Sequence, residues 1–240
     1  MMTSTRPSAP VAGEAPHPRR VFKRRAPVDL PEPLPLLHPL RPIESARVSR
    51  ELLPHNRVRM TIDHQPLEGV SPDMLLWWFT HIGGDLDYAG KRVSRYRAWH
   101  PLDHIAWALD REAPGGGAGE GARFAIREAF QRRSDMLVDS VDTVEKLDRT
   151  GIRLVLRVLG VQVFQLEHTW SAGRGRTHYV SVFDLGARSP WLAPVNAYLR
   201  RNVFRPHMDD AWLRHNVEEV GRLEFLLPGL VRAEAPQLLA

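Results

Sequence analysis

A run of short strand-like segments followed by one long helical stretch is the feature that most constrains the fold. Five segments alternate apolar and polar residues, as strands with one buried face do, and glycine turn signals separate several of them: 122–131, 136–145, 152–159, 161–171 and 177–186. From Pro190 almost to Leu227 the pattern is helical. Strands joined by short turns pair antiparallel. This order predicts an α+β fold in which a curved antiparallel sheet wraps around a long C-terminal helix.

Two shorter helices are predicted before these strands. Ser71-Pro72 is a helix start, and Gly83-Gly84 ends that helix near Ile82. Its sequence MLLWWF is too apolar for an exposed helix, so we expect it to be buried. A second helix is predicted over 101–109, because Pro101 suits the first position of a helix, where its missing N–H costs nothing.

The chain has 240 residues and no cysteine. This length allows one large α+β domain with a sizeable core. Without cysteine, disulfides and thiolate metal sites are excluded, so a metal could be bound only through His, Asp or Glu. No apolar run approaches the roughly 18 residues of a membrane span, and we expect no membrane partner.

Basic residues and prolines are concentrated near the N-terminus. Residues 1–50 hold nine Lys or Arg against four acidic residues, so residues 51–240 are neutral and have no basic footprint for nucleic acid. Half of the 20 prolines fall in residues 1–42, which predicts a disordered or extended leader before a domain spanning 43–240. No apolar stretch follows the sequence RRVFK, so we do not expect export, and the predicted location is cytoplasmic.

The stretch YRAWHPLDHI, residues 96–105, sets two histidines four residues apart among aromatic side chains. In the predicted helix, His100 lies at the start and His104 one turn inside, which brings the imidazoles close together. Such a pair could be ordinary packing, a proton-transfer site or half of a metal site. We prefer His104 as the functional imidazole, because one turn inside the helix it can be directed at the core.

The segment ARFAIREAF, residues 122–130, places a carboxylate on an apolar face. On a strand, Phe124, Ile126, Glu128 and Phe130 point to one side. Burial of an unpaired carboxylate is costly unless a cation or an ion-pair partner accompanies it. Glu128 is therefore paired with an inward arginine, exposed on an edge strand, or part of a site.

The last helical pattern carries one stripe with two polar members. Residues at helical spacing share a face that is apolar except at two positions: Met208, Trp212, His215, Glu219, Leu223 and Leu226. His215 and Glu219 lie one turn apart and point the same way, so they could chelate one metal ion. A surface His–Glu contact would have the same spacing and contribute little to stability.

Residues from different predicted elements therefore point to one interior: His104, Glu128, His215 and Glu219. Imidazole and carboxylate ligands suit Zn²⁺, and also Fe²⁺ or Mn²⁺. One zinc ion per chain, with an open coordination position, would polarise a carbonyl and lower the pKa of bound water toward about 7. The sequence thus predicts a metal site.

The ordered set MLLWWF, YRAWHPLDHI, a strand glutamate and HNVEEVGRLEFLLPGL resembles the family of 2,4-diacetylphloroglucinol hydrolase and phloretin hydrolase, over roughly residues 70–230. The resemblance implies a START-like helix-grip domain that holds zinc through two His and two Glu, here His104, Glu128, His215 and Glu219. It also implies hydrolysis of the C–C bond between a phenolic ring and an acyl group. The expected partner is a small aromatic acyl-phenol.

The resemblance also indicates which side chains surround the acyl group. Tyr96 matches the tyrosine that opens the first motif, and His168 and Tyr179 are candidates for a further His and Tyr near the acyl oxygen. Trp107 departs from the pattern, because studied members have a polar residue facing the substrate there. Four tryptophans would form an aromatic wall for a flat ring: Trp77, Trp78, Trp99 and Trp107.

Two other classes of function stay open. A helix-grip binding protein could hold an aromatic or polyketide ligand without chemistry, although a carrier has no need of two inward glutamates. An interaction protein could use the basic leader, with the domain as its scaffold. The chain could also form a homo-oligomer in any of these roles.

Overall fold

The computed structural model describes residues 29–239, and within them nine strands form one antiparallel sheet. The strand order is β1-β2-β11-β10-β9-β8-β7-β6, and β3 pairs with β11. The bounds are β1 Arg47–Leu53, β2 Arg57–Asp63, β3 Leu67–Glu68, β6 His104–Arg111, β7 Arg123–Ala129, β8 Leu137–Asp148, β9 Gly151–Val158, β10 Val161–Ala172 and β11 Arg176–Leu185. A separate hairpin joins β4 (Asp85–Tyr88) to β5 (Lys91–Ser94).

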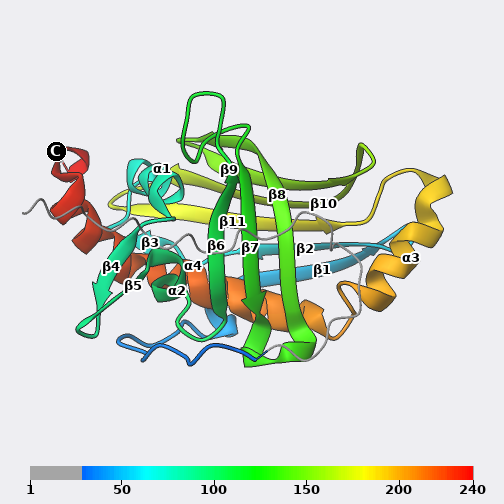
Figure 1. Cartoon of the computed structure of the whole chain (residues 1–240), viewed down its shortest axis with the longest axis horizontal. Helices are drawn as coiled ribbons and strands as arrows, with labels where there is room; N and C mark the ends of the chain where they lie inside the picture. The colour runs from blue at the N-terminus through cyan, green and yellow to red at the C-terminus, as the bar shows by residue number, and fades with distance from the viewer. Residues whose placement is uncertain (1–28, 240) are drawn as a thin grey trace, which may run out of the picture.

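The α-helices of this part of the chain are α1 (Pro72–His81), α2 (Arg95–Trp99), α3 (Ala193–Asn202) and α4 (Met208–Glu234). The sheet curves around α4, the long helix in Figure 1. This helix contacts β2 and β3, and its side chains also reach β6 and β7. The architecture is the predicted α+β helix-grip fold, with a curved antiparallel sheet around the long C-terminal helix.

The five strands predicted between residues 122 and 186 are confirmed as β7 to β11, each paired with the next. Two cross-strand pairs of β10 and β11 matter for the site, namely His168 opposite Ser181 and Trp170 opposite Tyr179. Paired residues point to the same face of a sheet. The meander therefore places residues from several strands on one inward face.

The predicted helix over 101–109 is wrong. Helix α2 ends at Trp99, and β6 begins at His104. His100 has extended backbone angles (φ −124°, ψ 91°), because the ring of the following Pro101 disfavours the helical region for the residue before it. That restriction ends α2, and Pro101 lies in the turn between helix and strand.

The other helix predictions are confirmed with one interruption. Ser71 caps α1, since its Oγ accepts a hydrogen bond from the backbone N–H of Met74 at 3.2 Å. The C-terminal helical pattern divides into α3 and α4 between Asn202 and Met208. The stripe of α4 that includes His215 and Glu219 is buried along its whole length.

The β1–β2 and β4–β5 hairpins are absent from the sequence-based prediction. Three residues, Pro54 to Asn56, connect β1 to β2, and the last two have φ angles of 66° and 59°, a left-handed conformation that hairpin turns use. Val58, Met60 and Ile62 are fully buried at alternate positions of β2, a period of two that identifies a strand. Through β2, this hairpin extends the sheet beyond β11.

Residues 29–42 run along the domain without α-helix or strand and are hydrogen bonded to it. The backbone N–H of Leu34 donates to the carbonyl of Pro101 at 3.0 Å. Other carbonyls of the segment accept hydrogen bonds from tyrosine and arginine side chains of the domain. Residues 1–28 of the predicted leader lie outside the described residues, and the domain boundary at residue 43 stays a prediction.

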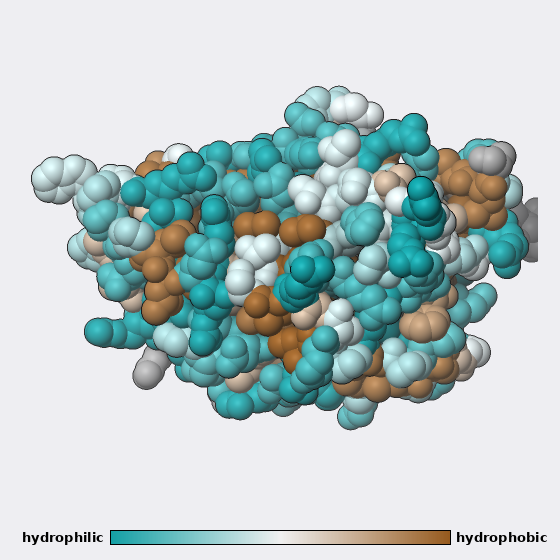
Figure 2. Space-filling model, turned by 180° about the vertical axis from the view of Figure 1, so that it is seen from behind, coloured by the Kyte–Doolittle hydropathy of each residue, from teal (hydrophilic) through white to brown (hydrophobic). Residues whose placement is uncertain are grey.

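Apolar side chains fill the space between the sheet and the helices. One hydrophobic cluster joins α1, α2 and the C-terminal half of α4, and another joins β2, β11 and the N-terminal half of α4. The face of the molecule seen in Figure 2 is mostly hydrophilic, with separate hydrophobic patches. No helix in residues 29–239 is both long and apolar enough to cross a membrane.

Candidate metal centre

Strands β6 and β7 and helix α4 bring the four predicted ligands together. His104 and Glu128 are opposite each other in the β6–β7 ladder, next to a break in the register that leaves Ile105 as an extra residue. Such a bulge changes the direction of a side chain. His215 and Glu219 approach this strand pair from α4. The site therefore consists of one cross-strand pair and one pair a helical turn apart.

The ligand atoms of His104, His215 and Glu219 all lie within 4.8 Å of one another, and both imidazoles also lie close to Glu128. His104 Nε2 lies 3.7 Å from Glu128 Oε2 and 3.3 Å from Glu219 Oε2. His215 Nε2 lies 3.4 Å from Glu128 Oε2 and 3.8 Å from Glu219 Oε2. Zinc bonds of roughly 2.0–2.2 Å give a tetrahedron with edges of about 3.3–3.6 Å. The distances between the side chains are close to these edges.

The orientation of His104 directs its Nε2 at the carboxylates. Its Nδ1 lies 2.7 Å from the backbone carbonyl oxygen of Tyr96, to which only an N–H can bond. A neutral ring with a proton on Nδ1 has none on Nε2. His104 Nε2 is buried and has no hydrogen-bond partner among the described residues. The ring of Tyr96 stacks on the imidazole, with centroids 3.9 Å apart, and holds its plane.

His215 is oriented by Asp103, which the sequence analysis misses. His215 Nδ1 lies 3.0 Å from Asp103 Oδ2, and the carboxylate also accepts the backbone N–H groups of Gln131 and Arg132. Burial raises the pKa of Asp103, but the hydrogen bond and charge of His215 outweigh it and lower the pKa to about 2. The ionised Asp103 therefore accepts a proton from Nδ1, and Nε2 of His215 faces the glutamates. Metal-binding imidazoles are usually fixed in this way.

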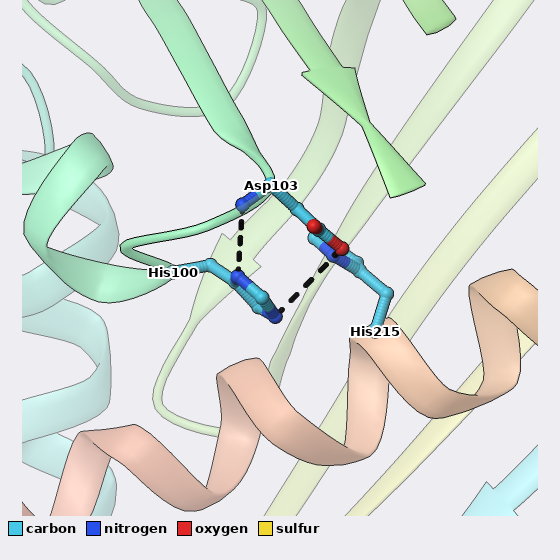
Figure 3. Close-up of side chains that lie close together, drawn as sticks. All are labelled: His100, Asp103 and His215. Carbon is cyan, nitrogen blue, oxygen red and sulfur yellow. Dashed lines mark hydrogen bonds and ion pairs between the residues drawn. The ribbon is translucent and has the colours of Figure 1, made fainter. Parts of the chain in front are cut away.

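His100 belongs to the supporting hydrogen-bond network rather than to the ligand set. Figure 3 shows His100 beside Asp103 and His215. The backbone N–H of Asp103 donates to His100 Nδ1 at 3.2 Å, and His100 Nε2 lies 3.2 Å from Glu218 Oε2. Burial, followed by the charge of His215, lowers the pKa of His100. Both nitrogens of His100 are thus occupied by the protein. We therefore prefer His104 to His100 as a metal ligand because of these contacts. The predicted position of His104 inside a helix is wrong, since this residue begins β6.

Hydrogen bonds from the protein also hold the two carboxylates. The hydroxyl of Tyr96 donates to Glu128 Oε2 at 3.0 Å, and Asn216 Nδ2 donates to Glu219 Oε1 at 2.5 Å. Burial raises the pKa of Glu219, but the two neighbouring imidazoles lower it to about 2. Glu219 is therefore ionised, with Oε1 fixed by the amide and Oε2 facing the imidazoles.

This arrangement requires a positive charge. Two imidazole lone pairs and two carboxylates repel one another in a buried place unless a cation lies among them. A proton is one such cation: burial opposes it, yet the charge of Glu128 and the hydrogen bond to Asp103 raise the pKa of His215 well above its usual value. A divalent metal ion would satisfy all four groups at once. Two nitrogens and two oxygens fit Zn²⁺, Fe²⁺ or Mn²⁺.

His168 and Tyr179, the two further predicted residues, lie close together on β10 and β11. Both are buried, and their rings are 5.4 Å apart. Burial lowers the pKa of His168 to about 4, against the charge of Glu219. Burial, followed by Glu219, raises the pKa of Tyr179. The Tyr179 hydroxyl has no hydrogen-bond partner among the described residues, so it can bind a ligand oxygen.

The four predicted tryptophans belong to one hydrophobic cluster, in which the rings of Trp78 and Trp99 meet edge to face with centroids 5.6 Å apart, and the aromatic wall for a ligand stays a prediction. Trp77 stacks on His81 of its own helix, and Trp99 donates its indole N–H to a backbone carbonyl of α4 at 2.7 Å. Other indole N–H groups are buried without a partner in residues 29–239: those of Trp78, Trp107 and Trp170. Buried donors without partners are rare in folded proteins. Such donors fit a ligand with acceptor oxygens.

Asp142 on β8 is a further inward carboxylate, absent from the sequence-based prediction. It is opposite Phe124 in the ladder and is 2% exposed. Ser140 Oγ donates to its Oδ2 at 2.7 Å, whereas Oδ1 has no partner among the described residues. Burial raises the pKa of Asp142 to about 7; the hydrogen bond from Ser140 opposes this shift, and Glu128 adds to it. The alternation that identifies Glu128 would have identified Asp142 in DSVDTVEKLD.

No family model and no curated protein matches this chain. Similar solved structures include ginseng major latex-like protein 151 from Panax ginseng, 8% identical with a TM-score of 0.46, covering 71% of this chain and 97% of that chain. A START superfamily protein from Mycobacterium smegmatis is 11% identical with a TM-score of 0.45, covering 72% and 98%. Protein Ms6760 from the same organism is 10% identical with a TM-score of 0.41, covering 78% and 97%. These likenesses concern the fold, and the resemblance to the hydrolase family stays a prediction.

Replacing His104 by alanine should remove the metal, whereas His100→Gln should not. Both imidazoles are buried, but only His104 presents its Nε2 to the glutamates. Elemental analysis of protein purified without chelators should give close to one zinc ion per wild-type chain. His104→Ala should lower zinc affinity by at least about 100-fold, more than the loss of an outer hydrogen bond does. Equal metal content in the folded His104→Ala variant and the wild type would contradict the site.

Asp142→Asn should change how stability depends on pH. The pKa of Asp142 in the folded chain, about 7, exceeds the ordinary value of 3.8. Between these values the unfolded chain has lost the proton that the folded chain keeps, so this group makes wild-type stability fall as pH rises. From pH 4 to pH 7 the free energy of unfolding of the variant should therefore rise relative to that of the wild type, by at most about 4 kcal/mol. Above pH 7 the difference between the two should be constant. Urea unfolding of chelator-treated protein measures this, and a pH-independent difference would refute the assignment.

Proposed function

We propose that the protein is a zinc-dependent hydrolase that cleaves the C–C bond between a phenolic ring and an acyl group. The observation that carries the proposal is the quartet of His104, Glu128, His215 and Glu219, in which each imidazole Nε2 lies 3.3–3.8 Å from both carboxylates. The family resemblance supplies the reaction. The proposed partner is a small aromatic acyl-phenol, and the proposed location is the cytoplasm.

The bond in question resists hydrolysis because its leaving group is a carbanion. Hydroxyl groups beside the acyl group relieve this difficulty, since the ring can take up a proton at carbon and become a ketone. Water adds to the acyl carbonyl, the C–C bond breaks, and its electrons are accepted by the ring ketone as an enolate. The products are a carboxylic acid and the deacylated phenol. The protein must therefore bind an oxygen-rich ring and control protons at its oxygens.

The side chains around the quartet suit this task. A zinc ion bound there would polarise the acyl carbonyl and acidify a water molecule. Tyr96, which donates to Glu128, places a phenolic hydroxyl at the edge of the quartet. His168 and Tyr179 supply an imidazole and a second hydroxyl, both under the influence of the Glu219 charge. These groups can hold or move protons at ring and acyl oxygens.

A second candidate is a binding protein that holds an aromatic or polyketide ligand without chemistry. The START-like fold favours it, because sheet and helix enclose an interior lined by aromatic side chains. None of the similar structures named above carries a name that describes a hydrolase. The fold supports ligand binding more directly than it supports hydrolysis. Binding of a small aromatic ligand is thus common to both candidates, and the quartet is the reason to add catalysis.

A trihydroxyphenyl ketone should be cleaved to a carboxylic acid and the free phenol, whereas its fully O-methylated analogue should be inert. Methylation prevents the ketone tautomer, so the ring carbon cannot be protonated before the bond breaks. Product formation is measured by chromatography. The control is His104→Ala, which lacks one of the proposed metal-binding side chains. If the zinc-loaded wild type bound the ketones but formed no product, the hydrolase proposal would be wrong and the binding-protein candidate would take its place.

Tyr96→Phe should slow cleavage of the trihydroxyphenyl ketone by ~10²-fold, as the loss of a positioned proton donor commonly does. The variant keeps the ring that stacks on His104, so its zinc content should equal that of the wild type. Tyr198→Phe is the matched control, because Tyr198 is 45% exposed on α3. If turnover in Tyr96→Phe equalled that of the wild type, the Tyr96 hydroxyl would have no role in the reaction.

A further inference from the structure

One oxygen of the Asp142 carboxyl group is left without a partner by the protein itself. Ser140 Oγ donates to Oδ2 at 2.7 Å, whereas Oδ1 is buried and has no hydrogen bond among the described residues. Asp142 is 2% exposed, and Val144, the next residue on the same face of β8, is fully buried. Buried polar atoms without partners are rare in folded proteins, because each one loses its hydration without compensation. A water molecule or a bound ligand must therefore complete the hydrogen bonding of Oδ1.

The strand register directs Asp142 to the interior that holds the quartet. Strands β7 and β8 pair without a break, with Glu128 opposite Val138 and Phe124 opposite Asp142. Paired residues, and alternate residues along a strand, share one face of a sheet. Glu128 and Phe124 are four residues apart on β7, which corresponds to about 13 Å along the strand. Asp142 thus lies on the same inward face as Glu128, farther along the sheet.

An aromatic ring and a second unpaired group lie beside this carboxyl group. Phe124 is on β7, between β8 and β6. It is opposite Asp142 on one side, and on the other its ring meets that of Trp107 edge to face, with centroids 5.0 Å apart. The indole N–H of Trp107 is buried without a partner in residues 29–239. One phenyl ring is therefore flanked by an unpaired carboxyl oxygen and an unpaired donor.

A hydroxyl is the ligand group that suits such surroundings. It can donate to an ionised carboxylate or accept from a protonated one, and it can also accept from an N–H. Burial raises the pKa of Asp142 to about 7, so both forms of the carboxyl group exist near neutral pH. An ammonium group would bring a second charge into this buried place, which is costly. A flat ring with a hydroxyl at its edge fits better.

We propose that Oδ1 of Asp142 binds the ring hydroxyl opposite the acyl group, so that Asp142 determines which phenolic rings the protein accepts. As a statement about the substrate, this inference rests on the proposed function, in which the acyl carbonyl lies at the quartet. A ring held there extends along β7 and β8, and its far edge meets the carboxyl group of Asp142. The substrate class is thereby narrowed to acyl-phenols with a free hydroxyl at that position.

A pair of ligands isolates this hydroxyl. The trihydroxyphenyl ketone is compared with an analogue that lacks only the hydroxyl opposite the acyl group, on the full-length, zinc-loaded protein. Discrimination is the ratio of the two kcat/KM values where the ketones are cleaved, and the ratio of calorimetric dissociation constants where they are bound without cleavage. Comparing this ratio between wild type and variant cancels the intrinsic reactivity of each ketone.

Asp142→Leu, which removes both oxygens, should reduce the discrimination by about tenfold, as the loss of one buried hydrogen bond does. Asp142→Val, an apolar residue that strands favour, takes its place if the leucine variant does not fold. The matched control is Asp139→Leu, because Asp139 is on the same strand but points to the other face, where it lies 2.9 Å from Arg127. This control should keep the wild-type ratio.

The outcomes separate this inference from the proposed function. If a folded Asp142 variant keeps the wild-type ratio while both ketones are cleaved, Oδ1 bonds only water, and the inference is wrong although the hydrolase stands. If the ketones are bound without cleavage and the variant loses the discrimination, the hydrolase is wrong and the role of Asp142 is supported. Failure of the wild type to bind either ketone would overturn both.

Discussion

Two imidazoles and two carboxylates face one another inside this protein, and their charges must balance there. Each imidazole directs its Nε2 at the carboxylates because its Nδ1 is bonded to Tyr96 or to Asp103. Neither His104 nor His215 is free to turn away, since both rings are buried. A positive charge among them, either the proton of His215 or a bound metal ion, converts the repulsion into attraction.

One turn of α4 carries side chains that belong to the quartet and one that supports it. His215 and Glu219 point at the β6–β7 pair, and Asn216 donates to Glu219. The charge of Glu219 also opposes the burial that lowers the pKa of His168. The quartet is therefore coupled electrostatically to a histidine on β10.

The fold places these groups through irregularities as much as through regular strands. Because Ile105 forms a bulge, His104 and Trp107, three residues apart, point to the same interior face of the sheet. In an unbroken strand, residues 104 and 107 would point to opposite faces. Gly83 allows this position for Trp107, since a Cβ there would lie 2.4 Å from the indole ring. The packing of Gly83 against the indole therefore accommodates Trp107, the residue that departs from the hydrolase pattern.

Local periodicity in the sequence determined the strands from 122 to 186, the buried stripe of α4 and the inward direction of Glu128, because side-chain direction along one element follows from its repeat alone. The helical repeat also predicted that His215 and Glu219 lie on one face of α4. Local reasoning failed at His100 and Pro101, where two proline preferences compete and only the surrounding chain shows which one applies. Asp103 acquires its role from His215, a partner distant in the sequence. Tertiary structure alone decided this pairing, since a hydrogen bond across the interior leaves no period in the sequence.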